Sequence, residues 1–259
     1  MLVKILFSKD TVNNYVNNYA EDFMRTIDRR RTKSTAQGDS TATKVSMRQA
    51  AYERIEALLN SGALGPGQLI TQRELVEMTG LTLGSVREAV PRLEAEGLLQ
   101  TLPKRGLMVP SLDVTFVRNA YQMRQVIELA AIPDMIEGLG TQTVEEWIDW
   151  NRGALERVGS EENEALVQEI QHLDWAMHEA FVGAMHNDLI SNVYRVTAIK
   201  IRMAVQSRIK VTVLNVHRVI HEHLRILEAL NKGDATGTHD ALALHLDNSL
   251  KLALGVAVD

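Results

Sequence analysis

Four side chains with the chemistry of metal ligands recur at helical spacing in the second half of the sequence. In the segment EIQHLDWAMHEAF, Asp174 and His178 lie four residues apart, so on a helix they share one face. His223 and His245 fall within the apolar stripes of two later helical segments. One carboxylate and three imidazoles on inward faces are ligands expected of a divalent transition metal such as Zn, Ni or Mn. Each could instead be a core residue satisfied by hydrogen bonds.

The segment HEHLRILEAL separates two neighbouring histidines. His221 and His223 lie about 200° apart around a helix axis, so only one of them can face the core. His223 lies within the apolar face that contains Ile220 and Leu227, so we expect His223 inside and His221 outside. As an alternative, His217 and His221 could bind a metal at the surface, although no carboxylate on another element is evidently directed at them.

The elements that position these residues are expected to be helices. Beyond Pro110 the sequence has no convincing strand pattern, and its apolar periodicity predicts an all-helical antiparallel bundle of about six helices. The predicted helices span 113–139, 143–158, 161–186, 188–209, 214–231 and 234–253. A two-residue connection joins the last two, so these helices are expected to be antiparallel neighbours. The predicted fold class is mainly α.

Residues 45–110 follow a different plan. Two short helices are expected, one with Thr71 as N-cap and Glu74 completing a capping box, the other with Thr82 as N-cap. The segment LLQTLPKRGLMV then predicts a hairpin with a basic tip. Two helices joined by a tight glycine turn and followed by such a hairpin indicate a winged helix-turn-helix that binds double-stranded DNA. Pro91 lies inside the second helix and is expected to kink or loosen it.

Composition and charge agree with a two-part chain. The 259 residues include no cysteine, and 45% are hydrophobic. Residues 1–110 hold 15 Lys and Arg against 12 Asp and Glu, whereas residues 111–259 hold 13 against 21, so only the first part suits a polyanionic partner. We expect a cytoplasmic protein with no membrane segment. Residues 1–44 are expected to be an N-terminal extension with a flexible linker, and translation is suspected to begin at Met24.

Position within the helix-turn-helix selects the candidate DNA contacts. The second helix enters the major groove with its first turn, while the preceding helix and the hairpin hold phosphates. Arg87 is the best candidate for a base contact, because a guanidinium can donate two hydrogen bonds to guanine. The others are Thr82 and Ser85 on the same helix, Arg73 on the preceding one, and Lys104 and Arg105 on the hairpin. A solvated, charged exterior face is the alternative reading.

The segment GQLITQRELVEMTGLTLGSVREAVPRLEAEGLLQTLPKRGLMV resembles the winged helix-turn-helix of the GntR family of bacterial transcription regulators. The resemblance implies DNA contacts at Arg73, Thr82, Arg87, Lys104, Arg105 and Gly106. This chain has Leu83 where the family often has Arg, and Gly84 where it often has a hydroxyl residue. Leu83 cannot donate to a base, so the operator is expected to differ from that of its relatives.

LDWAMHEAF, HEHLRILEAL and NKGDATGTHDALALHL resemble segments of the FCD effector domain of FadR-type GntR regulators. That resemblance implies a metal held by Asp174, His178, His223 and His245. The segment YQMRQVIELAA resembles the first effector helix, in which Arg124 would bind the carboxylate of a small organic acid. The alternative for Arg124 is a surface ion pair with Glu128.

The expected protein is a DNA-binding transcription regulator, not an enzyme, and the family resemblance implies a homodimer. Its expected domains are the extension 1–44, the winged helix-turn-helix 45–110 and the helical FCD-type domain 111–259. A divalent metal and a small carboxylate effector in the helical domain would modulate operator binding. Two other interpretations remain open: a metal-dependent enzyme acting on a small organic acid, and a regulator whose metal is structural or is itself the signal.

Overall fold

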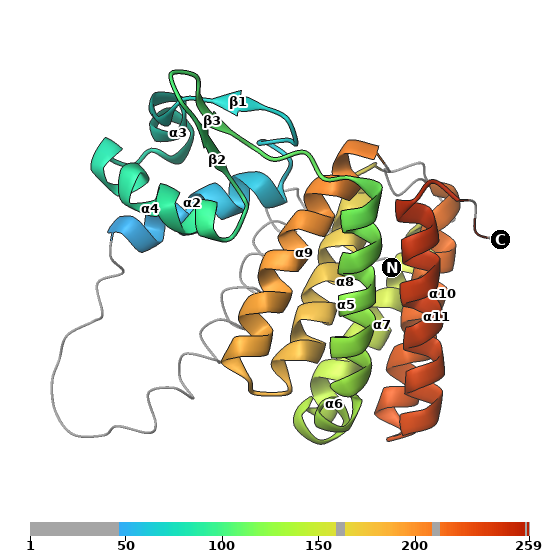
Figure 1. The fold of residues 1–259 in the computed structure, drawn as a ribbon. Helices are drawn as coiled ribbons and strands as arrows, with labels where there is room; N and C mark the ends of the chain where they lie inside the picture. Colours follow the sequence, from blue (N-terminus) through green and yellow to red (C-terminus); the bar gives the residue numbers. More distant parts are fainter. Residues whose placement is uncertain (1–46, 159–163, 209–212, 257, 259) are drawn as a thin grey trace, which may run out of the picture. The chain divides into compact units, whose positions relative to one another are not determined.

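The computed structural model describes residues 47–158, 164–208, 213–256 and 258. The predictions for the extension 1–44, including the linker and a start at Met24, lie outside the described residues. In the remainder, a small α/β module (residues 47–109) precedes a helical part (residues 114–253; Figure 1). The predicted fold class is therefore confirmed.

The module contains three helices and a three-stranded antiparallel sheet. Its elements are α2 (Met47–Asn60), β1 (Leu69–Ile70), α3 (Gln72–Thr79), α4 (Leu83–Ala95), β2 (Gln100–Leu102) and β3 (Gly106–Met108). The predicted hairpin is β2–β3, and β3 lies in the middle of the sheet, with β1 on its other side. The sequence prediction missed β1, because two residues are too few to show an alternating pattern.

Local side-chain chemistry sets the boundaries of α3 and α4 as predicted. The Thr71 side chain accepts from the Glu74 amide while the Glu74 carboxylate accepts from the Thr71 amide, which completes the capping box. Gly80 ends α3 with φ of 66°, and the Thr82 side chain caps α4. Pro91 does not interrupt α4, which is one continuous helix with Pro91 on its exposed side.

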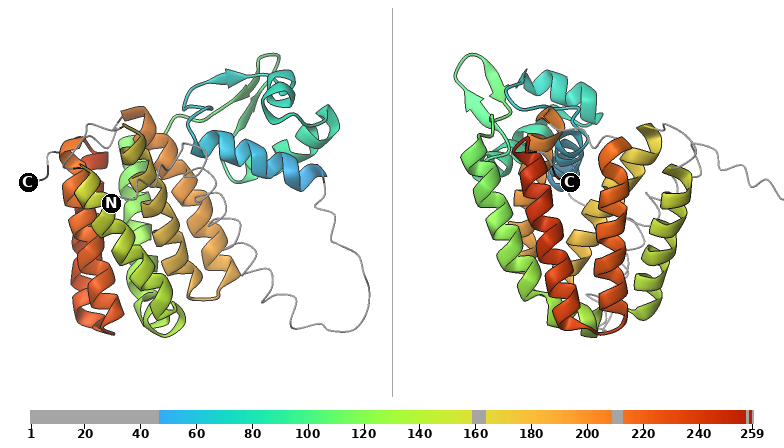
Figure 2. Two further views of the ribbon diagram at one scale, coloured as in Figure 1. Left: turned by 180° about the vertical axis from the view of Figure 1, so that it is seen from behind. Right: turned by 90° about the vertical axis from the view of Figure 1, so that its right-hand side faces the viewer.

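Seven helices form the described part of the chain beyond Pro110. They are α5 (Val114–Ala130), α6 (Ile132–Gly138), α7 (Thr141–Val158), α8 (Glu164–Gly183), α9 (Asp188–Arg208), α10 (Val213–Asn231) and α11 (Ala235–Ala253). The single helix predicted over 113–139 is wrong, because the chain breaks at Ala131 and α6 begins with Pro133 in its first turn. Figure 2 shows α10 beside α7 and α11, its main packing partners.

The interior of the bundle is apolar around a few buried charged groups. Trp147 of α7 and Phe181 of α8 meet edge to face in its largest hydrophobic cluster. Arg124, Glu128 and Glu222 are also buried, although charged side chains are seldom buried without partners. No helix of the described residues is both long enough and apolar enough to cross a membrane.

Helix α9 contacts both the module and the bundle. Ile199 and Met203 complete the hydrophobic core of the module, whose other buried members come from residues 51–109. Arg195 forms an ion pair with Glu56 of α2 at 2.8 Å and donates to the hydroxyl of Tyr52 at 2.8 Å. One helix therefore joins the two packed cores.

Candidate metal centre and nucleic-acid interface

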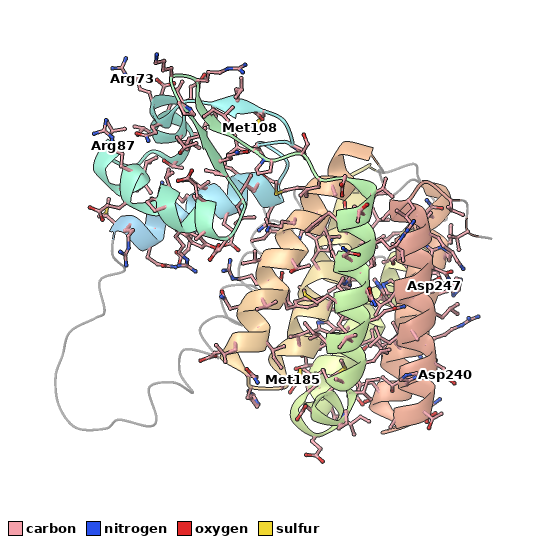
Figure 3. All side chains as sticks on the ribbon, in the orientation of Figure 1. Arg73, Arg87, Met108, Met185, Asp240 and Asp247 are labelled. Carbon is pink, nitrogen blue, oxygen red and sulfur yellow. The ribbon has the colours of Figure 1, made fainter. Side chains whose placement is uncertain are left out.

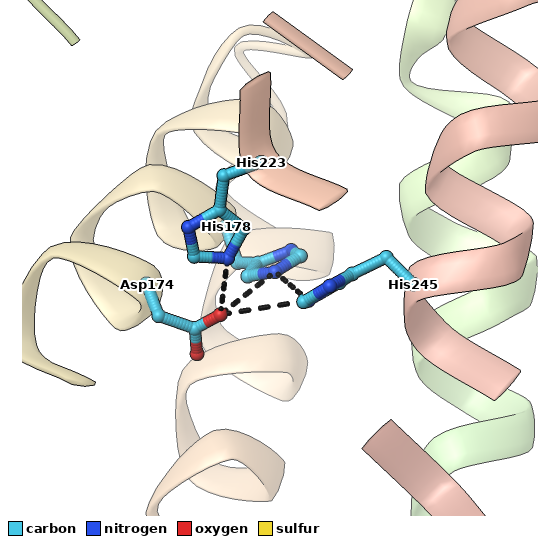
Figure 4. Close-up of side chains that lie close together, drawn as sticks. All are labelled: Asp174, His178, His223 and His245. Atoms are coloured by element: carbon cyan, nitrogen blue, oxygen red, sulfur yellow. Dashed lines mark hydrogen bonds and ion pairs between the residues drawn. The ribbon is translucent and has the colours of Figure 1, made fainter. Parts of the chain in front are cut away.

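Helices α8, α10 and α11 bring the four predicted metal ligands together (Figure 4). Asp174 Oδ1 lies 2.9 Å from His223 Nε2, and 3.5 Å from Nε2 of both His178 and His245. One potential ligand atom from each residue lies within 4.8 Å of all the others. We call these four residues the histidine cluster. As predicted, His223 is buried and His221 is exposed; His217 is exposed as well.

Buried carboxylates determine which imidazole nitrogens face the centre of the cluster. His178 Nδ1 lies 2.5 Å from Glu128 Oε2, and His245 Nδ1 lies 2.9 Å from Glu222 Oε2. Each Nδ1 donates its proton to an ionised carboxylate, so each Nε2 carries a lone pair. These two Nε2 atoms lie only 3.1 Å apart. Two lone pairs at that separation repel unless a cation or a proton lies between them.

The cluster fits a divalent transition metal. Bonds from zinc to imidazole nitrogen or carboxylate oxygen measure about 2.0–2.2 Å, which separates ligand atoms around one ion by roughly 3.0–3.5 Å. The contacts of 2.9, 3.1 and 3.5 Å between cluster atoms agree with that separation. Metal-ligating histidines also commonly donate Nδ1–H to a carboxylate, as His178 and His245 do.

The surroundings of the cluster favour an ionised Asp174 and shift the pKa values of His223 and His245 in opposite directions. Burial raises the pKa of Asp174, but hydrogen bonds from the three histidines outweigh it and hold this pKa well below its usual range. Burial lowers the pKa of His223 to about 4. Burial also lowers the pKa of His245, yet its hydrogen bonds to Asp174 and Glu222 outweigh burial and raise that pKa to about 9. In the metal-free cluster, the imidazolium form is therefore favoured at His245 and disfavoured at His223.

Two Arg–Glu pairs of the same spacing support the cluster from either side. Arg124 donates to Glu128 at 2.7 Å on α5, and Arg218 donates to Glu222 at 2.5 Å on α10. Glu128 is 0% exposed and also accepts from the Tyr194 hydroxyl at 2.7 Å. Although burial raises the pKa of Glu128, the charges of Arg124 and His178 lower it to about 2.

The sequence prediction placed neither glutamate against a histidine. The alternative of a surface ion pair between Arg124 and Glu128 was half right, because the pair forms but is buried. The available signal was the R-x-x-x-E spacing, which occurs at Arg124 and again at Arg218.

A cavity opens beside the cluster. Its volume is about 100 Å³, which is room for several water molecules or a small ligand in their place. Asp174, His178 and His245 line it together with Arg124, the predicted effector contact. Its remaining polar lining includes two further arginines, and its apolar lining comes from α8, α9, α10 and α11.

The helix-turn-helix module exposes most of the predicted DNA contacts. Figure 3 shows Arg73 and Arg87 projecting outward from α3 and α4. Thr82, Lys104 and Arg105 are exposed too. Among the described residues, these five charged or polar side chains form what we call the DNA-reading surface.

Ser85 and Gly106 have structural roles and offer no exposed side chain to DNA. Ser85 is 5% exposed, and its hydroxyl donates to the Thr82 carbonyl at 2.8 Å. Gly106 has φ of 101°, and a Cβ at this position would lie 2.9 Å from the carbonyl oxygen of Ile70. Their DNA contacts stay predictions, because the structure contains no nucleic acid.

Gln72 binds one arginine of this surface, a contact that the sequence did not reveal. Its Oε1 accepts from Arg87 Nε at 3.1 Å, across 15 residues of sequence. This bond orients the guanidinium and leaves its two terminal nitrogens free for a base edge. Nothing in the local sequence indicated that α3 holds an arginine of α4.

Comparison with protein families gives two matches that cover most of the described chain. Residues 47–109 match the family of bacterial regulatory proteins named gntR, and residues 119–248 match the FCD domain. The chain belongs to the GntR family. Its members with this domain arrangement are DNA-binding transcription regulators and not enzymes, so the enzyme interpretation is set aside.

Individual relatives are distant but span both parts of the chain. The uncharacterized HTH-type transcriptional regulator YdhC of Bacillus subtilis is 23% identical over 206 residues, which cover 76% of this chain and 86% of YdhC. The HTH-type transcriptional repressor RspR of Escherichia coli is 25% identical over 190 residues, covering 71% and 78%. The solved structure of E. coli McbR/YncC has the same fold, with a TM-score of 0.70 and 19% identity over 82% of this chain and 98% of that one.

Proposed function

We propose that this GntR-family regulator binds a divalent transition metal at Asp174, His178, His223 and His245, and that a small carboxylate effector beside the metal modulates operator binding. The observation that carries the proposal is the 3.1 Å approach of two imidazole Nε2 atoms whose Nδ1 atoms are bonded to buried carboxylates. A bound metal would supply a Lewis-acidic centre to which a carboxylate oxygen can coordinate.

The residues around the cluster support an acidic effector. Arg124 lines the cavity and already holds the carboxylate that orients His178. Its guanidinium supplies positive charge beside the metal site, and much of the remaining lining of the cavity is apolar. A small acid that enters the cavity would therefore lose its bound water and gain contacts with fixed positive charges in a largely apolar enclosure.

Helix α9 offers a route from the cavity to the DNA-binding module. Tyr194 lines the cavity and bonds to Glu128, while the next residue, Arg195, pairs with Glu56 of the module. An effector that displaces Tyr194 would shift Arg195 as well, because both belong to one turn of a rigid helix. This arrangement provides the differential contact that allosteric control requires.

We further propose a cytoplasmic homodimer. Two copies would present two α4 helices to a two-fold operator, the arrangement that helix-turn-helix regulators use. Sedimentation equilibrium of the full chain tests this directly, and a monomer at concentrations that bind operator would contradict it.

Metal retention by matched histidine variants tests the centre. His223→Ala is expected to abolish retention of metal after purification, whereas His221→Ala on the exposed side of the same helix keeps it. Metal content is measured by inductively coupled plasma mass spectrometry, with zinc, nickel and manganese supplied separately. Equal metal content in both variants would contradict the proposed ligand set.

Thermal shift assays separate a sensor from a structural metal. Chelated and metal-loaded proteins are screened against small organic acids, and operator affinity is then measured with each stabilising acid. The proposal expects acids that stabilise only the metal-loaded protein and change its operator affinity. A metal that stabilises the fold while no acid binds would instead favour a structural metal or a metal signal.

A further inference from the structure

Arg218 has an unused hydrogen-bonding edge inside the protein. Its Nη1 donates to Glu222 Oε1, whereas its Nε and Nη2 are buried and have no hydrogen-bond partner among the described residues. The side chain is only 15% exposed. Nε and Nη2 lie on one edge of the guanidinium plane, the edge that binds a carboxylate through two parallel hydrogen bonds. Leaving charged donors buried and unsatisfied is costly, so a group that accepts from them would gain the full benefit of pairing.

Arg218 and the histidine cluster line the same cavity, although the Nε and Nη2 atoms themselves are buried. Arg218 lines the cavity, and Glu222, which binds its Nη1, binds His245 Nδ1 through the other carboxylate oxygen. The carboxylate of Glu222 therefore links Arg218 to His245, one of the proposed metal ligands. A ligand held at the cluster has Arg218 within the same enclosure.

A second arginine approaches the cavity from α9. Arg202 donates Nη2 to Glu179, but its Nε is also buried without a partner, and its side chain is 9% exposed. The guanidinium carbon lies 4.7 Å from the centre of the Trp175 ring, which restricts its orientation. Two cationic side chains on different helices thus line one cavity, and each has a buried nitrogen without a partner among the described residues.

The charges around the cavity favour an anionic ligand. Arg124, Arg202 and Arg218 are paired with or lie near four carboxylates, those of Asp174, Glu128, Glu179 and Glu222, of which Glu179 is the most exposed at 40%. With neutral imidazoles, a divalent metal would bring these groups to a net charge of about +1. One carboxylate at the metal would compensate that charge, so a second acidic group would depend on the donors of Arg218 and Arg202 that lack a partner among the described residues.

Given the metal and effector site proposed above, we infer that the effector is a small dianionic acid. One acidic group faces the metal, and the second accepts two hydrogen bonds from Nε and Nη2 of Arg218, with Arg202 beside it. The same chemistry is offered by a dicarboxylate and by a phosphorylated acid. Ligand titration distinguishes these two sources.

Isothermal titration of the zinc-loaded full chain compares acids of matched length. Malonate, succinate and glutarate are titrated beside propionate, butyrate and valerate, and phosphoglycolate represents the phosphorylated acids. At least one dianion is expected to bind about 10- to 100-fold more tightly than its monoanionic counterpart, as one bidentate charged contact allows. The preferred dianion identifies the source of the second group.

Substitutions at Arg218 assign the second group to this side chain. Arg218→Met keeps part of the aliphatic stem but removes the donors, and it is expected to remove most of the preference for dianions over monoanions. The ratio of the two affinities is the measured quantity, because Glu222 also loses its partner in this variant. Arg218→Lys keeps a charge for Glu222 without the two-donor edge, so it decides the matter if the methionine variant does not fold. Arg225→Met, an exposed arginine of the same helix, serves as control and keeps the preference.

The possible outcomes distinguish failure of the effector site itself from failure of the proposed second contact at Arg218. If only monocarboxylates bind, or if Arg218→Lys loses affinity for both classes equally, the dianion inference is wrong while the effector site stands. If no acid of either class binds the zinc-loaded protein, the proposed effector function fails and the inference fails with it.

Discussion

The DNA-reading surface exposes its charged side chains to solvent, whereas the histidine cluster and its carboxylate partners enclose theirs. Arg73, Arg87, Lys104 and Arg105 are exposed, and their charges are available to a partner outside the molecule. The charged groups of the cluster are enclosed and bonded to one another, and the carboxylate of Glu128 is 0% exposed. A solvated charge adds little to folding stability, whereas an enclosed one becomes destabilising as soon as its partner is removed.

This difference predicts which property a substitution should change in each region. On the DNA-reading surface a lost side chain should weaken DNA binding and leave the free energy of unfolding almost unchanged. Around the histidine cluster the same kind of substitution should reduce stability as well as ligand binding. Four predictions test this contrast, beginning with the largest effect.

Glu128→Ala should be the most destabilising of these substitutions. It removes the acceptor of Arg124, Tyr194 and His178, and leaves the Arg124 guanidinium buried without its countercharge. Breaking a buried ion pair in this way costs about 3–5 kcal/mol of the free energy of unfolding. Urea denaturation measures the loss. Glu137→Ala, at an exposed position of α6, should stay within about 0.5 kcal/mol, and a similar change in both variants would contradict the contrast.

Gly106→Ala should destabilise the module through its backbone. The residue has φ of 101°, and the added Cβ would lie 2.9 Å from the Ile70 carbonyl oxygen, so β1 and β3 could not keep their register. We expect a loss of about 1–3 kcal/mol, together with weaker DNA binding.

Gly153→Ala is the matched control for that substitution. Gly153 lies within α7 and its Cβ would meet nothing within 4 Å, so the alanine should stabilise the protein by about 0.5–1 kcal/mol. A stable Gly106→Ala protein with intact DNA binding would show that the close approach of β1 is not essential.

Features that depend on neighbouring residues in the sequence could be predicted, whereas contacts between distant helices could not. The caps at Thr71 and Thr82 depend on residues three positions away, and the burial of His223 follows from its position in a helical repeat, so local pattern was sufficient. By contrast, Glu128 lies 50 residues from His178, and Glu222 lies 23 residues from His245. Which helices meet is decided by packing of the whole bundle, and no spacing within one helix reveals it.

Some misses had a local signal. Pro133 in the first turn of α6 marks the break that the helix predicted over 113–139 ignored. The contacts of Gln72 with Arg87 and the free edge of Arg218 had none, because each depends on how a flexible side chain orients once its neighbours are in place. Sequence therefore predicted which four residues form the histidine cluster, whereas the residues that orient them required the fold.

Arg87→Ala should weaken DNA binding without loss of stability. The predicted bidentate contact with guanine is worth about 1–3 kcal/mol, or roughly 10- to 100-fold in affinity, and its loss should relax specificity at one base pair. Lys104→Ala should weaken binding more evenly across sequences and reduce the salt dependence. Fluorescence anisotropy on duplexes selected from a random library measures both variants. A loss of folding stability above about 0.5 kcal/mol for Arg87→Ala would contradict the contrast.

Gln72→Ala is the smallest and most discriminating change. Gln72 Oε1 accepts from Arg87 Nε at 3.1 Å at an exposed position, so its removal frees the guanidinium to rotate at a cost of about 0.5–1 kcal/mol in DNA affinity. If Gln72 acts only through Arg87, the substitution should have no further effect in an Arg87→Ala background. A double-mutant cycle on the selected duplex provides this measurement. Additive losses would show that Gln72 contacts DNA by itself, and the DNA-reading surface would then include α3 beyond Arg73.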